Sequence, residues 1–296
     1  MRWLVGGPAI VWCLTISVAS SAQDKFLESK GIRIRYVDQG SGEPVVLVHG
    51  YTSSIERGWM DTGVFANLTK DHRVIAFDVR GHGKSAGPHD PKAYGNEMSQ
   101  DIVRLLDHLG IRRAHIVGYS MGGRIVTKLL TTNPERFLTA TLGGFGEVNW
   151  TAADDQVAEA EAAETERGLF RALILSIAPT DEPVPTDEAI RQRSQQIIGY
   201  GNDPMALAAL VRTRRDLAVT EAQLAAVRVP TEAIVGSADS RLAAVNHLKM
   251  VLPALKVVVV QGAVHSTTNE RGAARRPEFC NTIREFIAAH HAQSSK

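Results

Sequence analysis

The stretch AHIVGYSMGGR (residues 114–124) joins an apolar run to a helical pattern through a serine that has glycines on both sides. Residues 114–118 are apolar enough for a buried strand, and the segment after Gly123 has the spacing of a helix that Pro134 stops. A serine in so sharp a turn takes a strained backbone conformation, and neighbours without side chains let strand and helix pass close to it. The sequence therefore predicts that Ser120 is an exposed nucleophile.

The Gly-x-Ser-x-Gly pattern occurs twice, as GKSAG (83–87) and as GYSMG (118–122), so its surroundings must decide between the copies. No apolar run directly precedes GKSAG, and Pro88 prevents a helix from starting directly after it. We therefore expect Ser85 to be an ordinary loop serine. For Ser120 the alternative is a glycine-rich turn with an incidental serine.

A serine hydroxyl needs a base to act as a nucleophile near neutral pH, and that base needs a partner that orients it. His265 lies just after the apolar run at 256–262, which we expect to be a buried strand. Loops at the carboxyl ends of parallel strands gather at one edge of a sheet. We therefore predict that His265 is the base.

The acid that would orient His265 has two candidates. Asp239 closely follows the predicted strand at 231–236 and gives the chain order Ser, Asp, His. Glu147, which comes after the predicted strand at 139–144, is the alternative. We favour Asp239 because it follows its strand more tightly.

Short apolar segments alternate with helical patterns along most of the chain. Strands are predicted at 32–38, 45–50, 73–78, 114–118, 139–144, 231–236 and 256–262, and helices at 97–110, 124–134 and 278–291. This alternation predicts an α/β fold with a mostly parallel central sheet and helices on both faces.

The alternation breaks between residues 147 and 227. Three helical segments are predicted there, at 154–177, 186–199 and 204–218, with no buried strand among them. We therefore expect residues 23–146 and 228–296 to form the core and residues 147–227 to form a helical lid.

Composition excludes several classes of protein. The 296 residues are 44% apolar and 22% charged, which does not fit a disordered chain or a coiled coil. Lys and Arg number 33 against 32 Asp and Glu, a formal charge of +1, so no overall field favours nucleic acid or an anionic membrane. The expected partner is a small-molecule substrate, and the oligomeric state does not follow from the sequence.

Residues 1–22 have the pattern of a secretory signal peptide: a positive start at Arg2, an apolar stretch, and small residues before a cut after Ala22. The alternative is an uncleaved membrane anchor, but Gly-Gly-Pro at 6–8 interrupts the apolar run. We expect a secreted or periplasmic mature chain without a stable membrane span. Its one cysteine, Cys280, lies on an apolar helical stripe and is expected to be buried.

Five motifs together resemble the α/β-hydrolase superfamily, in its serine-nucleophile branch with a helical lid. They are VVLVHGY (45–51), FDVRGHGKS (77–85), GYSMGG (118–123), GSAD (236–239) and GAVH (262–265). The resemblance implies that the backbone N–H groups of Tyr51 and Met121 form an oxyanion hole and that the lid covers the pocket. It also implies that Asp78, Arg80 and His82 are mainly structural.

The resemblance implies hydrolysis through an acyl-serine, most simply of a small or medium carboxylic ester, with no cofactor. Carbon–carbon bond hydrolases, lactonases, perhydrolases and aminopeptidases of this fold use the same triad, and a non-catalytic small-ligand receptor is a further alternative. The acids and histidines lack a spacing such as H-E-x-x-H, so no metal is predicted. Trp150, where the chain leaves the sheet, is the predicted pocket wall, whereas Arg212, Arg214 and Arg215 are expected on a solvated face.

Overall fold

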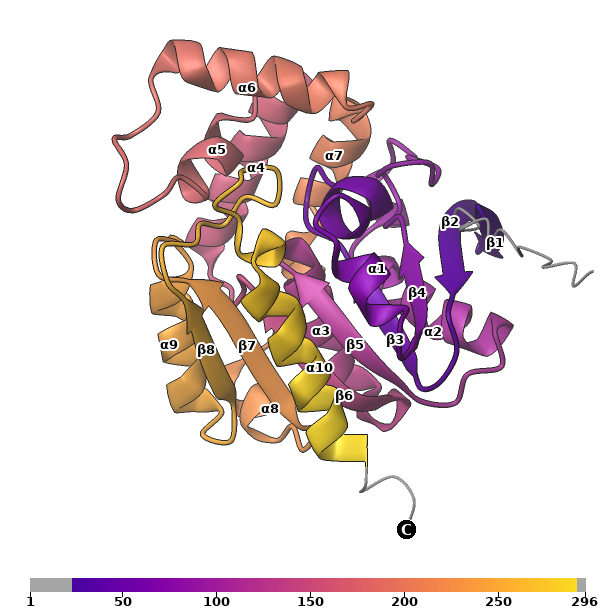
Figure 1. The fold of residues 1–296 in the computed structure, drawn as a ribbon. Coiled ribbons are helices and arrows are strands. Elements are labelled where there is room, and N and C mark those ends of the chain that lie inside the picture. Colours follow the sequence, from indigo (N-terminus) through magenta and orange to yellow (C-terminus); the bar gives the residue numbers. More distant parts are fainter. Residues whose placement is uncertain (1–22, 292–296) are drawn as a thin grey trace, which may run out of the picture.

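The computed structural model describes residues 23–291, so the predicted signal peptide at 1–22 lies outside the described residues. Its centre is a sheet of eight strands in the order β1-β2-β4-β3-β5-β6-β7-β8 (Figure 1). The strands are β1 (Lys25–Ser29), β2 (Ile32–Gln39), β3 (Pro44–Val48), β4 (Arg73–Phe77), β5 (Ala114–Tyr119), β6 (Phe137–Gly143), β7 (Thr231–Gly236) and β8 (Lys256–Val260). Strand β2 pairs antiparallel with β1 and with β4, and every other pair is parallel. The predicted α/β fold with a mostly parallel sheet is confirmed.

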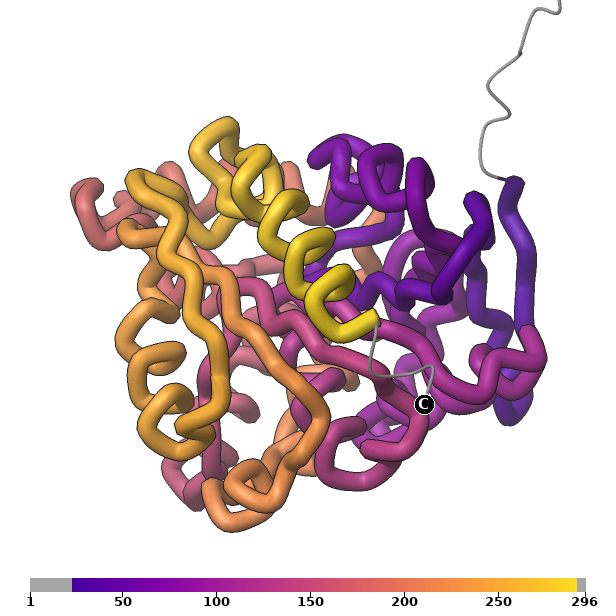
Figure 2. The backbone as a smooth tube through the Cα atoms, turned by 60° about the horizontal axis from the view of Figure 1, so that its bottom comes forward, coloured from indigo at the N-terminus to yellow at the C-terminus, as the bar shows by residue number. Residues whose placement is uncertain are grey.

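Helices cover both faces of this sheet. They are α1 (Val64–Leu68), α2 (Asn96–His108), α3 (Met121–Thr132), α8 (Glu221–Ala225), α9 (Leu242–Val251) and α10 (Pro277–His291). Single turns of π- or 3-10 helix lie at Glu56–Met60, Pro91–Ala93, Pro134–Arg136, Arg214–Leu217 and Ala273–Arg275. Figure 2 shows α10, in yellow, lying across one face of the sheet.

Alternate residues of the buried strands feed two separate cores. In β3, Val46 and Val48 belong to the core beneath α2, α3, α8 and α9, whereas Val45 and Leu47 belong to the core beneath α1 and α10. This follows from the two-residue period of a strand. An unbroken apolar run is thus what a central strand of a two-faced sheet requires.

Strand β8 differs from the expectation. The Val-rich run was expected to be a strand buried on both faces, yet β8 lies at the edge of the sheet and only Val260 of its residues is buried. An edge strand has a neighbour on one side only, so its apolar side chains are partly exposed.

The insert contains no strand. Its helices are α4 (Ala152–Glu166), α5 (Arg171–Ser176), α6 (Asp187–Gly199) and α7 (Pro204–Val211), which stand together beyond one end of the strands (Figure 1). The segment 154–177, expected to be one helix, forms two, because Gly168 takes a positive φ of 76° and its N–H donates to Thr165 O. A left-handed glycine of this kind ends a helix.

Candidate active site

The turn between β5 and α3 has the geometry that the glycines predict. Ser120 has φ 53° and ψ −113°, and α3 begins at the next residue, Met121. A Cβ on Gly118 would lie 2.3 Å from Gly122 O, and a Cβ on Gly122 would lie 2.0 Å from Val48 O. Any side chain at either position would therefore push the strand and the helix apart. The glycines hold Ser120 at the strand end.

His265 lies between Ser120 and Asp239. Its Nε2 is 2.9 Å from Ser120 Oγ, and its Nδ1 is 3.0 Å from Asp239 Oδ2 and 3.1 Å from Oδ1. An ionised carboxylate only accepts hydrogen bonds, so Nδ1 carries the proton and Nε2 accepts from the serine hydroxyl. His265 is 4% exposed and Asp239 2% exposed, so both are shielded from water. The structure thus brings the three predicted residues into one hydrogen-bonded chain.

Two further contacts fix this chain in place. Asp239 Oδ1 also accepts a hydrogen bond from Arg241 N–H at 2.8 Å. The hydroxyl of Tyr119, which the sequence analysis did not single out, donates to His265 O at 2.8 Å. Burial, and then the nearby Asp239 carboxylate, raise the pKa of Tyr119, so its phenol stays a donor. A buried tyrosine directly before the serine is a signal that sequence reasoning could have used.

Glu147, the alternative acid, has other partners. Its Oε2 accepts a hydrogen bond from Arg124 Nη2 at 2.7 Å, and its Oε1 accepts one from Arg241 Nη1. Glu147 is therefore an ion-pair partner of two arginines, and the carboxylate that contacts His265 is that of Asp239.

The loop after β3 lies against the serine. A Cβ built on Gly50 would be 3.4 Å from Ser120 Cβ, which leaves the chain at Tyr51 beside the nucleophile. Met121 is the first residue of α3, and the first N–H groups of a helix have no partner within it. Both predicted oxyanion-hole residues thus adjoin Ser120, and their role stays a prediction.

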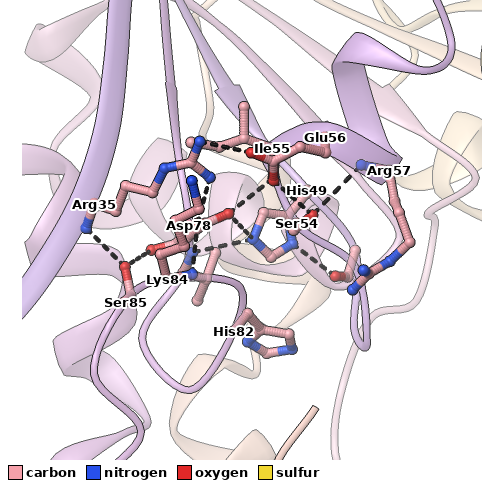
Figure 3. Close-up of polar contacts among 12 residues, drawn as sticks. Arg35, His49, Ser54, Ile55, Glu56, Arg57, Asp78, His82, Lys84 and Ser85 are labelled. Carbon is pink, nitrogen blue, oxygen red and sulfur yellow. Dashed lines mark hydrogen bonds and ion pairs between the residues drawn. The ribbon is translucent and has the colours of Figure 1, made fainter. Parts of the chain in front are cut away.

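His49 ties this loop to the next one (Figure 3). Its Nδ1 donates to Gly50 O at 2.8 Å, and its Nε2 accepts from Val79 N–H at 3.1 Å. Burial lowers the pKa of His49 to about 4, so the ring is neutral and performs both roles near neutral pH. The same figure shows His82, whose pKa burial lowers to about 3.

Asp78 gathers the rest of this network. Its carboxylate accepts from Ile55 N–H at 2.8 Å, from Lys84 N–H at 2.9 Å and from Arg35 Nη1 at 3.0 Å (Figure 3). Ser85 Oγ donates to Asp78 O at 2.6 Å and accepts from Arg35 N–H at 2.8 Å. Ser85 is therefore held in a loop by structural contacts, as the sequence predicts.

Two cavities meet at Ser120. The first, of about 100 Å³, is lined by His265, by loops of the core, by residues of α5 and α6 such as Ile174 and Ile197, and by Tyr200 just after α6. The second, of about 400 Å³, lies between the start of α3, the segment 144–151 and helices α4 and α7. Tyr51, Leu173 and Ile177 line both.

Trp150 and Arg214 both line the second cavity. Trp150 thus lies where a pocket wall would be, and its Nε1 donates to Asp155 Oδ1 at 2.8 Å. The expectation that Arg214 lies on a solvated face was wrong. Its side chain is 21% exposed and forms two hydrogen bonds with Glu161, because α7 packs against α4 and directs the following turn inward.

Within residues 23–291, no group of three or more His, Cys, Asp or Glu side chains is placed to hold a metal ion. No helix in that range is both long and apolar enough to cross a bilayer. Cys280 is buried and free.

Comparisons with known proteins agree with the fold. A family model described as the alpha/beta hydrolase fold matches residues 43–165. The chain is 30% identical over 218 residues to a 2-hydroxymuconate semialdehyde hydrolase of Pseudomonas putida, which covers 71% of this chain and 75% of that one. It is 39% identical over 100 residues to esterase YbfF of Escherichia coli, 33% of this chain and 37% of that one.

A solved carboxylesterase structure from Nitrososphaera gargenis superposes with a TM-score of 0.72 at 20% identity, over 91% of this chain and 100% of that one. Other curated relatives are matched over a smaller part of their length. The chain spans about a third of the acetyltransferase component of an acetoin cleaving system from Cupriavidus necator, at 33% identity over 135 residues.

Proposed function

Since the chain belongs to the α/β-hydrolase family, we propose that it is a secreted or periplasmic serine hydrolase that cleaves a small or medium carboxylic ester through an acyl-serine intermediate. The observation that carries this proposal is the hydrogen-bonded chain from Ser120 Oγ through His265 to Asp239. Such a chain activates a hydroxyl that is otherwise a weak nucleophile.

In the first half of the reaction, Ser120 Oγ attacks the ester carbonyl carbon while His265 Nε2 takes the hydroxyl proton. The tetrahedral oxyanion accepts hydrogen bonds from the N–H groups of Tyr51 and Met121. His265, held as imidazolium by Asp239, then gives its proton to the leaving alcohol oxygen as the carbon–oxygen bond breaks. The product is an acyl-serine and a free alcohol.

In the second half, water attacks the acyl carbon and gives a proton to His265. Collapse of the second tetrahedral intermediate releases the carboxylic acid and returns the proton to Ser120 Oγ. No redox step or external acceptor is needed, and the three residues end in their starting protonation states.

A carbon–carbon bond hydrolase is the second candidate, supported by the similarity to 2-hydroxymuconate semialdehyde hydrolase over most of both chains. Two activity assays of the purified mature protein separate the candidates. One uses 2-hydroxymuconate semialdehyde as the substrate, and the other uses chromogenic acyl esters from acetyl to long chain. Faster turnover of the semialdehyde would replace the ester proposal.

Ser120 is the proposed nucleophile. Ser120→Ala should abolish ester turnover and labelling by a fluorophosphonate probe while the fold survives, because one partly exposed hydroxyl contributes little to packing. Ser85→Ala is the control: it loses loop contacts and some stability, but folded protein should still be labelled. Turnover or labelling that persists in Ser120→Ala overturns the proposed nucleophile.

Export is proposed from the sequence of residues 1–22. N-terminal sequencing of the protein recovered outside the cytoplasm should begin at Gln23. An intact N-terminus in that fraction would point to an uncleaved anchor instead.

A further inference from the structure

The second cavity contains a cluster of charges with more cations than anions. Arg124, on the first turn of α3, and Arg241, just after Asp239, both donate to the Glu147 carboxylate. All three side chains line the cavity that opens at Ser120. Two guanidinium groups share one carboxylate here, so these three side chains together carry a net charge of +1.

The other acids of the cavity are engaged elsewhere. Glu161 accepts two hydrogen bonds from Arg214, which makes a neutral pair. Asp154 accepts from the N–H and hydroxyl of Thr151 at the exposed start of α4. Neither acid forms a hydrogen bond with Arg124, Glu147 or Arg241, although Asp154 attracts Arg124 electrostatically.

Arg124 is held rigidly toward this space. Its side chain is 16% exposed, and its guanidinium lies 5.4 Å from the centre of the Phe145 ring and 5.8 Å from that of Trp150. Burial lowers the pKa of Arg124, partly countered by Glu147, which reflects the cost of keeping a cation there. A guanidinium with a fixed orientation loses little entropy when it binds a planar anion through two N–H groups.

The position of His265 indicates which part of a substrate would reach the cluster of Arg124, Glu147 and Arg241. The leaving alcohol must receive its proton from His265 Nε2, and His265 lines the first cavity but not the second. Ser120 lines both cavities, whereas Met121, at the start of α3, lines only the second. The alcohol part therefore fits the first cavity, and the acyl part fits the second.

We propose that the second cavity is an anion-binding acyl subsite, in which Arg124 and Arg241 recognise a carboxylate at the far end of the acyl group. The inference rests on the proposed ester hydrolysis and narrows its substrate class to monoesters of dicarboxylic acids. A carboxylate placed beside Glu147 would give each arginine a full counterion, in surroundings where charges interact more strongly than in water.

The experiment compares two substrates that differ in one ionised group. These are p-nitrophenyl hydrogen adipate, whose acyl chain ends in a carboxylate, and p-nitrophenyl methyl adipate, in which that carboxylate is masked. The wild-type protein should have the higher kcat/KM for the hydrogen adipate, by about tenfold, the value of one good charged contact. A third ester, 4-butanoyloxybenzoate, places the carboxylate on the alcohol and should show no such gain over its methyl ester.

Variants test the residues. Arg124→Gln and Arg241→Gln should each remove most of the preference for the hydrogen adipate, and Arg124→Lys should keep part of it. Arg191→Gln, an exposed arginine of α6 outside both cavities, should leave the preference intact. A wild-type protein that prefers the methyl ester, or a preference that survives both glutamine variants, overturns the inference.

Failure of the ester chemistry is distinguishable from failure of the subsite. If wild type cleaves neither adipate ester and the fluorophosphonate probe does not label Ser120, the proposed function fails. Monomethyl adipate can still be titrated calorimetrically into Ser120→Ala protein, with and without Arg124→Gln. Binding that does not weaken in the double variant overturns the subsite on its own.

Discussion

Backbone strain lies on both sides of the space where a carbonyl group would react. Ser120 has φ 53°, and Thr52, next to Tyr51, has φ 59°. A non-glycine residue in such a conformation costs about 1–3 kcal/mol and persists only where its surroundings impose it. Thr52 O accepts hydrogen bonds from Arg57 Nη2 and Asn202 Nδ2, so the core loop and the insert both hold it. Strain at these two residues fits a preorganised site.

The contacts of His265 lead to a prediction about the acid. Asp239→Asn should preserve the loop yet lower kcat by about 10⁴-fold, the loss seen when a triad aspartate loses its charge. With a neutral acyl ester, the loss for Glu147→Gln should be at least about a hundredfold smaller, because Glu147 contacts arginines rather than His265. Rates of the two variants at saturating ester decide the matter, and the reverse ranking would make Glu147 the acid.

At the scale of single elements, the turn between β5 and α3 leaves little room for an added side chain. Gly122→Ala should destabilise the fold by about 1–3 kcal/mol, because its Cβ would meet Val48 O at 2.0 Å. Labelling of Ser120 by the fluorophosphonate probe should decrease in the same variant. Gly199→Ala, at the end of α6, has nothing within 4 Å of its Cβ and should be neutral or slightly stabilising. Urea unfolding measures the stability of both variants. Equal stability of the two would contradict this account of the turn between β5 and α3.

Strand β7 carries a buried acid that predicts how stability varies with pH. Glu232 is 0% exposed and accepts a hydrogen bond from Thr141 Oγ1, with Lys256 Nζ 3.6 Å from its other oxygen. Burial, partly countered by Thr141 and Lys256, raises the pKa of Glu232 from 4.5 to about 7. Between these values the folded protein holds a proton that the unfolded chain has lost, so stability falls as pH rises.

Glu232→Gln should remove this dependence. The free energy of unfolding of the variant relative to wild type should rise between pH 4.5 and 7, by at most about 1.4 kcal/mol per pH unit. Denaturant unfolding at several pH values provides the measurement. A difference that stays constant across this window would show that Glu232 is ionised in the fold.

The elements also show what the sequence could and could not predict. Ser120, Asp239 and His265 each follow a strand, and parallel strands end at one edge, so their meeting place was predictable. Short edge strand β1 and helices α1, α8 and α9 were missed. The direction of Arg214 depends on how α7 docks on α4, which local pattern does not encode.

At the scale of the whole molecule, the core supplies the reacting groups and the insert supplies most of the walls. Helices α5 and α6 line the first cavity, and α4, α5 and α7 line the second. The insert was predictable as a helical block from its missing strands, but its division of the space above Ser120 into two cavities was not. That division requires the packing of four helices at once, and it suggests that acyl and alcohol preferences can be changed separately.

Two aromatic truncations test this separation. Trp150→Ala removes a wall of the second cavity, and Tyr200→Ala removes an exposed ring at the first, while the proposed catalytic residues are unchanged. In a graded series of acyl and alcohol chains, Trp150→Ala should move the preference to longer acyl groups, since each methylene accommodated contributes about 1–3 kcal/mol. Tyr200→Ala should change the preference among alcohols and keep the order of acyl groups. If the two variants exchange these effects, the acyl part occupies the cavity beside His265; if neither preference moves, the core loop around Tyr51 selects the substrate.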